Sequence, residues 1–228
     1  MKKKPARTTA VVPALNEETA LPRTLSRLRD CGFDIIVVDG GSLDRTAALA
    51  GEFGRVLSAP PGRARQMNLG AAAARGEFLF FVHADSRPPL DADNIIRRVL
   101  SRPGIAAGAF HLRIDSPDPR LKIISGLANL RSRCLGLPYG DQGLFLSRKT
   151  FQEAGGFPDI PLMEDVEMVR RLKTLGRVEL APGEMVASAR RWDRRGPFKN
   201  SAKNVFRLAR YYLGVSPEKL AAGYRNER

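Results

Sequence analysis

Three short apolar runs in the first half of the chain each stop at a polar group. The runs cover 9–12, 34–38 and 78–82. Continuous apolar runs of this length are typical of strands that are buried on both faces, which is the usual situation in parallel sheets. We therefore expect these three segments to be strands of a parallel sheet.

Polar side chains follow each of these runs at its carboxyl end. Asn16 and Glu17 follow the first run, Asp39 follows the second, and His83 and Asp85 follow the third. Because ligands of open parallel sheets bind beyond the carboxyl ends of the strands, these side chains are expected at one edge. An acidic cluster at that edge suits a metal ion, a ribose or a base edge, and suits a bare anion poorly.

Helical patterns separate the apolar runs of the first half. Helices are expected over 19–29, 44–53 and 63–75, and from 91 or 93 to 99. Strands that alternate with helices of this size indicate right-handed βαβ units and an α/β fold.

The second half of the chain is less regular. Its expected strands are 107–114, 143–147, 177–181 and 185–189, and its expected helices are 119–135, 164–175 and 198–213. Within 119–135, the pattern predicts that four residues face inward: Leu121, Ile124, Leu127 and Leu130.

The composition is that of a globular protein with one domain, since 43% of the 228 residues are hydrophobic and 27% are charged. No apolar run approaches the ~18 residues that span a bilayer. No apolar signal core follows the basic segment Met1–Pro5, so we expect a cytoplasmic protein. Cys31 and Cys134 stand far apart without metal-binding spacing, and reduced thiols are expected rather than a disulfide.

The formal net charge of +14 is unevenly distributed. The segment Arg190–Arg228 holds eleven Lys or Arg and three acidic residues, which gives it a charge of +8. Such a patch attracts polyanions, for example nucleic acid, acidic lipid or a phosphorylated substrate. A solvated surface without a partner is the alternative interpretation.

Five short motifs occur in an order that is typical of one enzyme family. They are Val12–Glu17, Val37–Thr46, Gly62–Gly70, Phe81–Asp85 and Met163–Val166. The series resembles family 2 glycosyltransferases. In that family, the corresponding segments are, in the same order, the opening strand with its loop, the Asp-Gly-Ser turn, the Arg/Asn helix, the Asp-x-Asp motif and the Glu-Asp pair of the catalytic helix. The small size and His-Ala-Asp in place of Asp-x-Asp resemble a small bacterial subgroup of that family.

The resemblance covers roughly 9–192 and implies a GT-A-like three-layer sandwich, with a mostly parallel central sheet and helices on both faces. We expect a single domain over 1–228. Its parts would be a nucleotide-binding half at 9–100, an acceptor and catalytic half at 101–192, and a basic helical tail at 193–228.

The resemblance also implies a site for a nucleotide-sugar donor of the UDP or GDP type. The implied donor-binding residues are Pro13, Leu15, Asn16, Glu17, Asp39, Gly40, Ser42, Arg63, Arg65, Asn68, Ala84 and Asp85. Asp39 at a strand end can accept hydrogen bonds from ribose hydroxyls or a uracil N–H, and its alternative role is that of a turn residue. Asn16 and Glu17 could also cap the first helix. Arg63 and Arg65 match phosphate oxygens but are equally suited to a surface.

Asp85 is the expected ligand of a Mn²⁺ or Mg²⁺ ion that bridges the phosphate oxygens of the donor. His83 stands where the family pattern has its first Asp. Imidazole tolerates Mn²⁺ better than Mg²⁺, so His83 is a metal ligand, a phosphate contact or a bystander.

Helical periodicity separates the roles of Glu164 and Asp165. Asp165 lies at the centre of the face formed by Met168, Val169 and Leu172, whereas Glu164 lies on its flank with Arg171. We expect Asp165 to be the general base and Glu164 to support it or contact the acceptor. The alternative is that these acids only stabilise the helix dipole.

Two segments are candidate acceptor contacts. Asp141 and Gln142 precede a short strand, where they contact the acceptor or form a plain turn. Arg191 and Trp192 resemble part of the Gln-x-x-Arg-Trp motif of processive relatives, with Ser188 in place of Gln. Arg191 would meet the diphosphate, and Trp192 would stack on a sugar or belong to the core.

The last helix, 198–213, places Lys199, Lys203, Arg207 and Arg210 on one face. This amphipathic pattern is compatible with peripheral contact at an anionic inner membrane face. The alternative is a helix that packs its apolar side on the core and exposes its basic side to water.

The sequence thus predicts an inverting glycosyltransferase that moves a sugar to an acceptor hydroxyl, with no specific nucleic-acid partner. A sugar-phosphate nucleotidyltransferase would need a Gly-rich basic loop after the first strand, but 13–18 is acidic and lacks Gly. A dinucleotide-binding dehydrogenase is disfavoured for the same reason. A non-catalytic module that binds polyanions or membranes through the basic tail is the remaining alternative.

Overall fold

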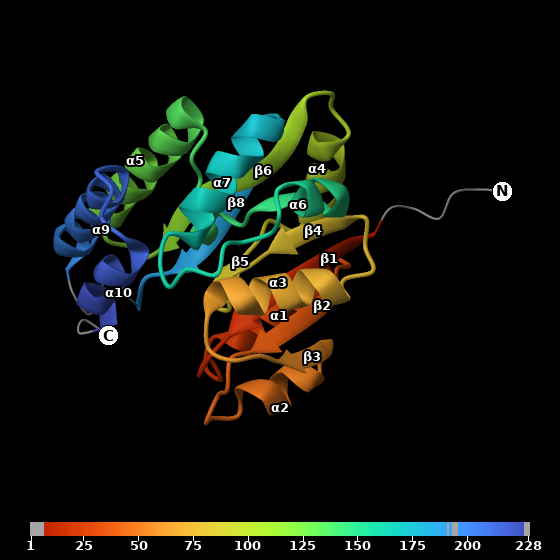
Figure 1. Cartoon of the computed structure of the whole chain (residues 1–228). Helices are drawn as coiled ribbons and strands as arrows, with labels where there is room; N and C mark the ends of the chain where they lie inside the picture. Colours follow the sequence, from red (N-terminus) through yellow and green to blue (C-terminus); the bar gives the residue numbers. More distant parts are fainter. Residues whose placement is uncertain (1–6, 191, 193–195, 226–228) are drawn as a thin grey trace.

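The first half of the chain forms four parallel strands of one sheet (Figure 1). The computed structural model describes residues 7–190, 192 and 196–225. The four strands are β1 (Thr8–Ala14), β2 (Asp34–Asp39), β3 (Arg55–Ser58) and β4 (Phe78–Phe81). All three pairings among them are parallel, as the apolar runs predict.

The second half extends the same sheet. Its strands are β5 (Ser86–Arg87), β6 (Ile105–Asp115), β7 (Phe145–Ser147) and β8 (Arg177–Ser188). The strand order is β3-β2-β1-β4-β7-β6-β8-β5, in which β7 runs antiparallel to both of its neighbours. One eight-stranded sheet therefore passes through both halves of the chain.

Helices cover both faces of the sheet. They are α1 (Leu21–Asp30), α2 (Thr46–Gly51), α3 (Arg63–Ala73), α4 (Ala92–Leu100), α5 (Pro119–Leu135), α6 (Arg148–Glu153), α7 (Glu164–Leu175), α9 (Pro197–Tyr212) and α10 (Pro217–Arg225), with a short 3₁₀ helix η1 (Gly140–Gln142). Successive residues of β1 point to opposite faces. Val12 packs in the cluster with α1 and α4, whereas Val11 packs in the cluster with α3, α6 and α7. This arrangement confirms the predicted three-layer α/β sandwich.

The order of the strands creates a switch point between β1 and β4. From β1 the chain proceeds to β2 and β3 on one side, and it then returns to place β4 on the other side of β1. Ligands of open α/β sheets bind at such a point, beyond the carboxyl ends of the strands. The loops that start at Leu15 and at Val82 flank it.

Strand β8 differs from the two short strands predicted around Pro182 and Gly183. It is one continuous strand, and its register against β6 shifts between the pairs Phe110–Ala181 and His111–Glu184. Pro182 and Gly183 are accommodated by this irregularity rather than ending the strand. The sequence patterns also missed β3, β5, α6 and α10, which are short or largely exposed.

The predicted inward face of α5 is wrong for two of its four residues. Leu121 is buried and Ile124 is half-buried, but the exposed fractions of Leu127 and Leu130 are 61% and 56%. The inner side of the helix instead carries Ser125 and Ser132, whose hydroxyl groups form hydrogen bonds within the interior.

The orientation of α9 also differs from the expectation of a core-packed helix with a solvated basic side. Arg207 is buried at 8% exposure, whereas Val205 and Phe206 are exposed at 67% and 62%. Leu208 and Tyr211 of this helix pack against the core, but the side that carries Val205 and Phe206 faces outward. No helix in the part of the chain that the structure describes is long and apolar enough to cross a membrane.

Candidate active site at the carboxyl edge of the sheet

The loops that follow β1 and β2 are joined by a set of hydrogen bonds. The backbone N–H of Asn16 donates to Ser42 Oγ at 2.9 Å, and Asn16 Oδ1 accepts from the N–H of Leu43 at 2.9 Å. The N–H of Glu17 donates to Thr46 Oγ1 at 2.8 Å. Neither Asn16 nor Glu17 caps α1, whose N-cap is Ala20 without a side-chain bond, so that alternative is wrong.

Asp39 organises the turn after β2. Its Oδ2 accepts from the N–H groups of Gly41 and Ser42 at 3.1 and 3.0 Å, and its Oδ1 accepts from the Ser42 hydroxyl. Asp39 is therefore a turn residue, as the alternative interpretation held. A carboxylate has about four acceptor positions, so this role leaves capacity for a ribose hydroxyl.

Gln66, which sequence reasoning did not select, holds the ends of β1 and β2 together. Its buried Nε2 donates to the carbonyls of Ala14 and Val38, both at 2.8 Å. A Cβ atom at Gly40 would lie 2.9 Å from this nitrogen, so glycine is needed there for the close approach. Of the other predicted donor residues, Ala84 is buried beside this edge, Pro13 is half-buried, and Leu15 is exposed at 38%.

Arg190 joins the loops after β1 and β4. Its Nη2 donates to Glu17 Oε2 at 2.7 Å and to Asp85 Oδ2 at 3.1 Å. Partial burial acts to lower the pKa of Arg190, but its hydrogen bonds to the two carboxylates and their charges raise this pKa overall. Its only signal in the sequence is its position directly after a predicted strand, and the pattern predicts the neighbouring Arg191 instead.

The predicted metal ligands fit a partial metal site. Among the described residues, no three His, Cys, Asp or Glu side chains converge to hold a metal ion. Mg²⁺ is commonly bound by one or two carboxylates together with substrate phosphates, and Asp85 supplies one such carboxylate. The imidazole of His83 on the same loop tolerates Mn²⁺ better than Mg²⁺. The position of Arg190 indicates that the Glu17–Asp85 pair attracts a cation.

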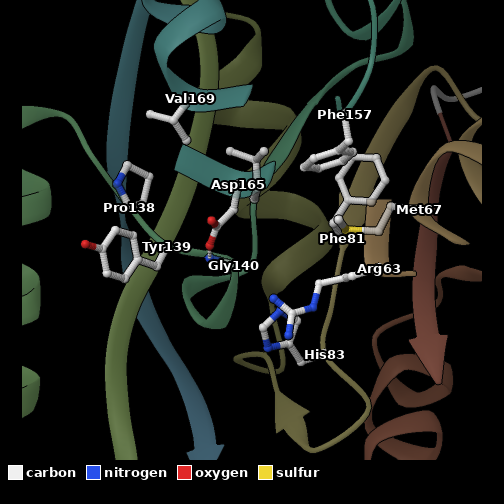
Figure 2. A pocket seen from close by; sticks show the side chains of 11 residues that line it. Arg63, Met67, Phe81, His83, Pro138, Tyr139, Gly140, Phe157, Asp165 and Val169 are labelled. Atoms are coloured by element: carbon white, nitrogen blue, oxygen red, sulfur yellow. Dashed lines mark hydrogen bonds between the residues drawn. The ribbon is translucent and has the colours of Figure 1, made fainter. Parts of the chain in front are cut away.

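A small pocket lies beside this edge, between α3, the start of α7 and the segment around η1 (Figure 2). It is lined by Arg63, Met67, Phe81, His83, Pro138, Tyr139, Gly140, Leu144, Phe157, Asp165 and Val169. Asp165 points from α7 toward Gly140, and Arg63 and His83 lie on the opposite side of the pocket. Most of the remaining lining is apolar, so a polar group that enters meets few competing partners.

Asp165 is held in place by two backbone donors. Its Oδ2 accepts from the N–H of Gly140 at 2.9 Å, and its Oδ1 accepts from the N–H of Val166 at 2.8 Å. A Cβ atom at Gly140 would lie 2.8 Å from His83 Nε2 and 3.4 Å from Asp165 Oδ2. Gly140 thus allows the imidazole and the carboxylate to approach the same point.

Glu164 is more buried than its predicted place on the flank of the helix implies, with an exposure of 3%. Arg63 Nη1 donates to Glu164 Oε1 at 2.9 Å, because the start of α3 packs against the start of α7 here. Burial raises the pKa of Glu164, the Arg63 guanidinium opposes this rise, and the charge of Asp165 adds to it. Of the two acids, only Asp165 lines the pocket.

Two predicted donor residues of α3 have partners elsewhere. Arg65 Nε bonds both oxygens of the exposed Asp159, at 2.8 and 2.9 Å. The amide of Asn68 donates to the carbonyl of Phe157 and accepts from its N–H, at 2.8 and 2.9 Å. Both residues fasten α3 to the loop before α7 and are not brought to the strand ends.

The predicted acceptor residues separate into different environments. Asp141 lies in η1, next to Gly140. The Gln142 side chain is fully buried and bonds Ser132 and the carbonyl of Phe110, so its amide groups are engaged inside the protein. Trp192 is 9% exposed and packs in a small core with Leu121, as its interpretation as a core residue expects. Arg191 lies outside the described residues.

A model of the family described as Glycosyl transferase family 2 matches residues 9–153. An uncharacterized glycosyltransferase of Mycobacterium tuberculosis is 33% identical over 93 residues, which cover 40% of this chain and 41% of that protein. The probable glycosyltransferase YdaM of Bacillus subtilis is 24% identical over 198 residues, which cover 73% and 46%. The chain therefore spans less than half the length of these curated relatives.

Solved structures show the same fold. The mannosyltransferase PcManGT from Pyrobaculum calidifontis, in complex with GDP-Man and Mn²⁺, has a TM-score of 0.69 at 18% identity, over 95% of this chain and 67% of that one. S. aureus TarS 1-349 in complex with UDP has a TM-score of 0.61 at 17% identity, over 80% and 60%. The described architecture is thus that of GT-A glycosyltransferases.

Proposed function

Since this chain belongs to glycosyl transferase family 2, we propose that it transfers a sugar from a nucleotide-sugar donor to an acceptor hydroxyl with inversion at the anomeric carbon. The observation that carries the proposal is the position of Asp165. Its carboxylate enters the pocket from α7 and accepts the N–H of Gly140. The side chain of His83, two residues after β4 at the switch point, lies against the same glycine. One acid therefore stands beside the edge at which an α/β sheet binds its ligands.

The proposed reaction is a single displacement. Asp165 accepts the proton of the acceptor hydroxyl while that oxygen forms a bond to the anomeric carbon. The bond from this carbon to the diphosphate oxygen breaks at the same time, and its electron pair leaves with the nucleoside diphosphate. A positioned general base contributes about 10²–10⁴-fold to such a step.

The other residues of the pocket position Asp165 and receive charge. The Gly140 N–H donates to Asp165 Oδ2 at 2.9 Å, and this hydrogen bond fixes the rotamer of the base. Glu164 does not line the pocket, so we propose a positioning role for its pair with Arg63. Asp85, with His83 as a second ligand, would hold Mn²⁺ or Mg²⁺, which when bound neutralises charge on the leaving diphosphate.

We propose a donor of the UDP or GDP type. Solved structures of the same fold contain UDP, UDP-GlcNAc or GDP-Man. In this chain, Asp39 and the loop around Asn16 form a joined surface beyond β1 and β2, where a ribose and a base would lie. The sugar and diphosphate would then extend past Asp85 toward the pocket of Asp165.

The test is a transfer assay with UDP- and GDP-sugars, with and without Mn²⁺, that follows nucleoside diphosphate release and the anomeric configuration of the product. Asp165→Asn keeps the shape of the side chain and an oxygen for the Gly140 N–H, so donor binding should survive while transfer falls about 10²-fold or more. Asp159→Asn removes an exposed carboxylate at the surface and is the matched control, with unchanged transfer.

Donor binding is measured separately by thermal shift with UDP, GDP, dTDP and CDP. Stabilisation by one diphosphate that depends on Mn²⁺ and is lost in Asp85→Ala would support the proposed donor site. Transfer that survives both Asp165→Asn and Asp85→Ala would refute the mechanism. A lack of stabilisation by every nucleotide would favour the non-catalytic binding module.

A further inference from the structure

Helix α5 presents an apolar stripe to solvent. Ile123, Leu127 and Leu130 are 57%, 61% and 56% exposed. At about 100° per residue, these three side chains fall within about 60° of one another around the helix. The opposite side of α5 also carries apolar residues, among them the buried Leu121, which packs on the ends of β6 and β8. A helix that is apolar on both sides is expected to have a partner on each of them.

Helix α9 presents a second apolar stripe. Val205 and Phe206 are 67% and 62% exposed, and Leu213, directly after the helix, is 83% exposed. Ala202 and Ala209 lie between them on the same outward side and are also exposed. The inner side of the helix is formed by Arg207, Leu208 and Tyr211, which are buried or half-buried.

The two stripes occupy neighbouring helices, because α5 and α9 contact each other and lie together at one end of the molecule (Figure 1). Among the described residues, eight of the thirteen large exposed apolar side chains belong to α5, α9 or the residue after α9: Ile123, Leu127, Leu130, Leu135, Val205, Phe206, Tyr212 and Leu213. Single exposed apolar residues are common on monomers, whereas a cluster of this kind indicates an interaction surface. We call these eight residues the α5–α9 surface.

The charge on these helices shows what kind of partner fits. The sequences of α5 and α9 contain no acidic residue, and they contain seven basic residues besides the inward-facing Arg207: Arg120, Lys122, Arg131, Arg133, Lys199, Lys203 and Arg210. On α5, the exposed Lys122 and Arg133 border the apolar stripe on one side. The exposed Arg120, which pairs with Asp118 just before the helix, borders it on the other. Apolar side chains between basic ones match the hydrocarbon and the anionic headgroups of a membrane surface.

We propose that the α5–α9 surface docks this protein on an anionic lipid bilayer. A second copy of the chain would bring two basic surfaces together without any acidic side chain on α5 or α9 to neutralise them. RNA would supply the negative charge but no apolar phase for six exposed aliphatic residues. An anionic bilayer supplies both, because its headgroups attract each basic residue near the surface and its hydrocarbon takes up the apolar stripe.

The surface is directly connected to the pocket described above. The Arg131 guanidinium of α5 stacks on the Tyr139 ring at 3.5 Å, and Tyr139 lines the pocket beside Gly140. Tyr211 of α9 donates from its hydroxyl to Glu167 Oε2 of α7 at 3.2 Å. Docking would therefore place the pocket of Asp165 close to the lipid headgroups. The proposal itself does not require the transferase activity.

The test is co-sedimentation of the full chain with vesicles of phosphatidylcholine alone, or of phosphatidylcholine with phosphatidylglycerol. We expect binding to the anionic vesicles, weakened by salt. The double variants Leu127→Gln/Leu130→Gln and Val205→Gln/Phe206→Gln should each reduce the partition coefficient at least about ten-fold, since each removes two inserted apolar side chains. Lys122→Gln/Arg133→Gln should reduce binding and make it less dependent on salt.

The matched control is Leu43→Gln/Leu90→Gln, which removes two leucines that are 96% and 65% exposed in other parts of the molecule, and it should bind as the unchanged protein does. Circular dichroism and thermal melts should show that all variants remain folded. Three results would each overturn the proposal: no binding to anionic vesicles, binding that the apolar variants leave intact, or a dimer in light scattering that these variants dissociate without any vesicle binding. Failure of vesicle binding would leave the transferase proposal untouched.

Discussion

Arg63 donates from Nη1 to Oε1 of Glu164 at 2.9 Å, and this pair joins the first residue of α3 to the first residue of α7. The Glu164 side chain is 4% exposed, whereas the Arg63 side chain keeps 29% of its surface in contact with solvent. Because Asp165 follows Glu164 directly, the pair anchors the backbone next to the candidate base.

The first prediction concerns the stability of this pair. Arg63→Met keeps the aliphatic stem but leaves a buried carboxylate without its cation. We expect the free energy of unfolding to fall by about 2 kcal/mol near pH 8, less than for a fully buried pair because Arg63 is partly solvated. The measurement is urea unfolding of both proteins at several pH values.

The pH dependence of that loss has a defined sign. Burial raises the pKa of Glu164 in the folded state, and the loss of Arg63 removes the group that opposes the rise. The stability that such a carboxyl group contributes is present at low pH and is lost as the pH rises through the folded-state pKa. The difference between Arg63→Met and the unchanged protein should therefore shrink near pH 5. Adding Glu164→Gln to Arg63→Met should restore part of the lost stability near pH 8.

Arg65→Met in the same helix is the matched control. Arg65 pairs with Asp159, and both side chains are more than half exposed. This substitution should change the free energy of unfolding by less than about 0.5 kcal/mol, with no dependence on pH between 5 and 8. Equal losses in the two variants would contradict the argument that burial of Glu164 is the cause.

The second prediction concerns Gly140. Gly140→Ala places a methyl group 2.8 Å from His83 Nε2, so the imidazole or the loop must shift. If Asp165 is the base, transfer should fall at least about ten-fold, because a displacement of about 1 Å can reduce catalysis by a larger factor than this. Gly51→Ala is the control, since a methyl group there meets no atom within 4 Å, and it should leave transfer unchanged. Full activity of Gly140→Ala would show that this close approach is unimportant.

The strands that carry the site could be predicted because each is buried on both faces. Their apolar runs are continuous, and the residue at which each run ends marks the carboxyl edge of the sheet. The inward direction of Asp165 was predictable for a related reason. Met168, Val169 and Leu172 are all buried, and one turn of helical geometry relates Asp165 to Val169.

Other features depend on tertiary contacts that leave no local signal. Arg190 meets Asp85 across 105 residues of sequence, and nothing near either residue specifies the partner. The inward side of α5 was misjudged because apolar residues occur on both of its sides, so periodicity predicts a helix without predicting which side is buried. The four residues of β3 are half-buried or exposed, and they form no apolar run.

The third prediction concerns Gln142, the fully buried amide of η1. Its Oε1 accepts from Ser132 Oγ at 2.6 Å and from Arg131 Nη2 at 3.2 Å, and its Nε2 donates to the carbonyl of Phe110 at 3.1 Å. Gln142→Leu leaves these buried groups unsatisfied, so the free energy of unfolding should fall by about 2–4 kcal/mol. Gln152→Leu on exposed α6 is the control, with a change below about 0.5 kcal/mol. Similar values for the two variants would show that the network is not stabilising.

The last prediction concerns competition for Asp85. The Arg190 guanidinium occupies the space between Glu17 and Asp85, so a divalent cation that binds Asp85 must displace or share this contact. In Arg190→Gln, the affinity of the nucleotide-free protein for Mn²⁺ should rise about two- to five-fold, the energy of one partly exposed ion pair. Electron paramagnetic resonance of free Mn²⁺ measures this binding directly.

Arg113→Gln removes the same charge from a residue that pairs with Asp115 and Glu184 rather than with Asp85, and it measures the general effect of net charge. If the affinity for Mn²⁺ rises equally in both variants, the rise is caused by long-range electrostatics. The contact between Arg190 and Asp85 is then irrelevant to metal binding. If the affinity for Mn²⁺ rises in Arg190→Gln alone, and Asp85→Ala abolishes this rise, then Arg190 and the metal ion bind the same carboxylate. In that case the Arg190 guanidinium pairs with Asp85 as long as no donor and no metal ion are bound.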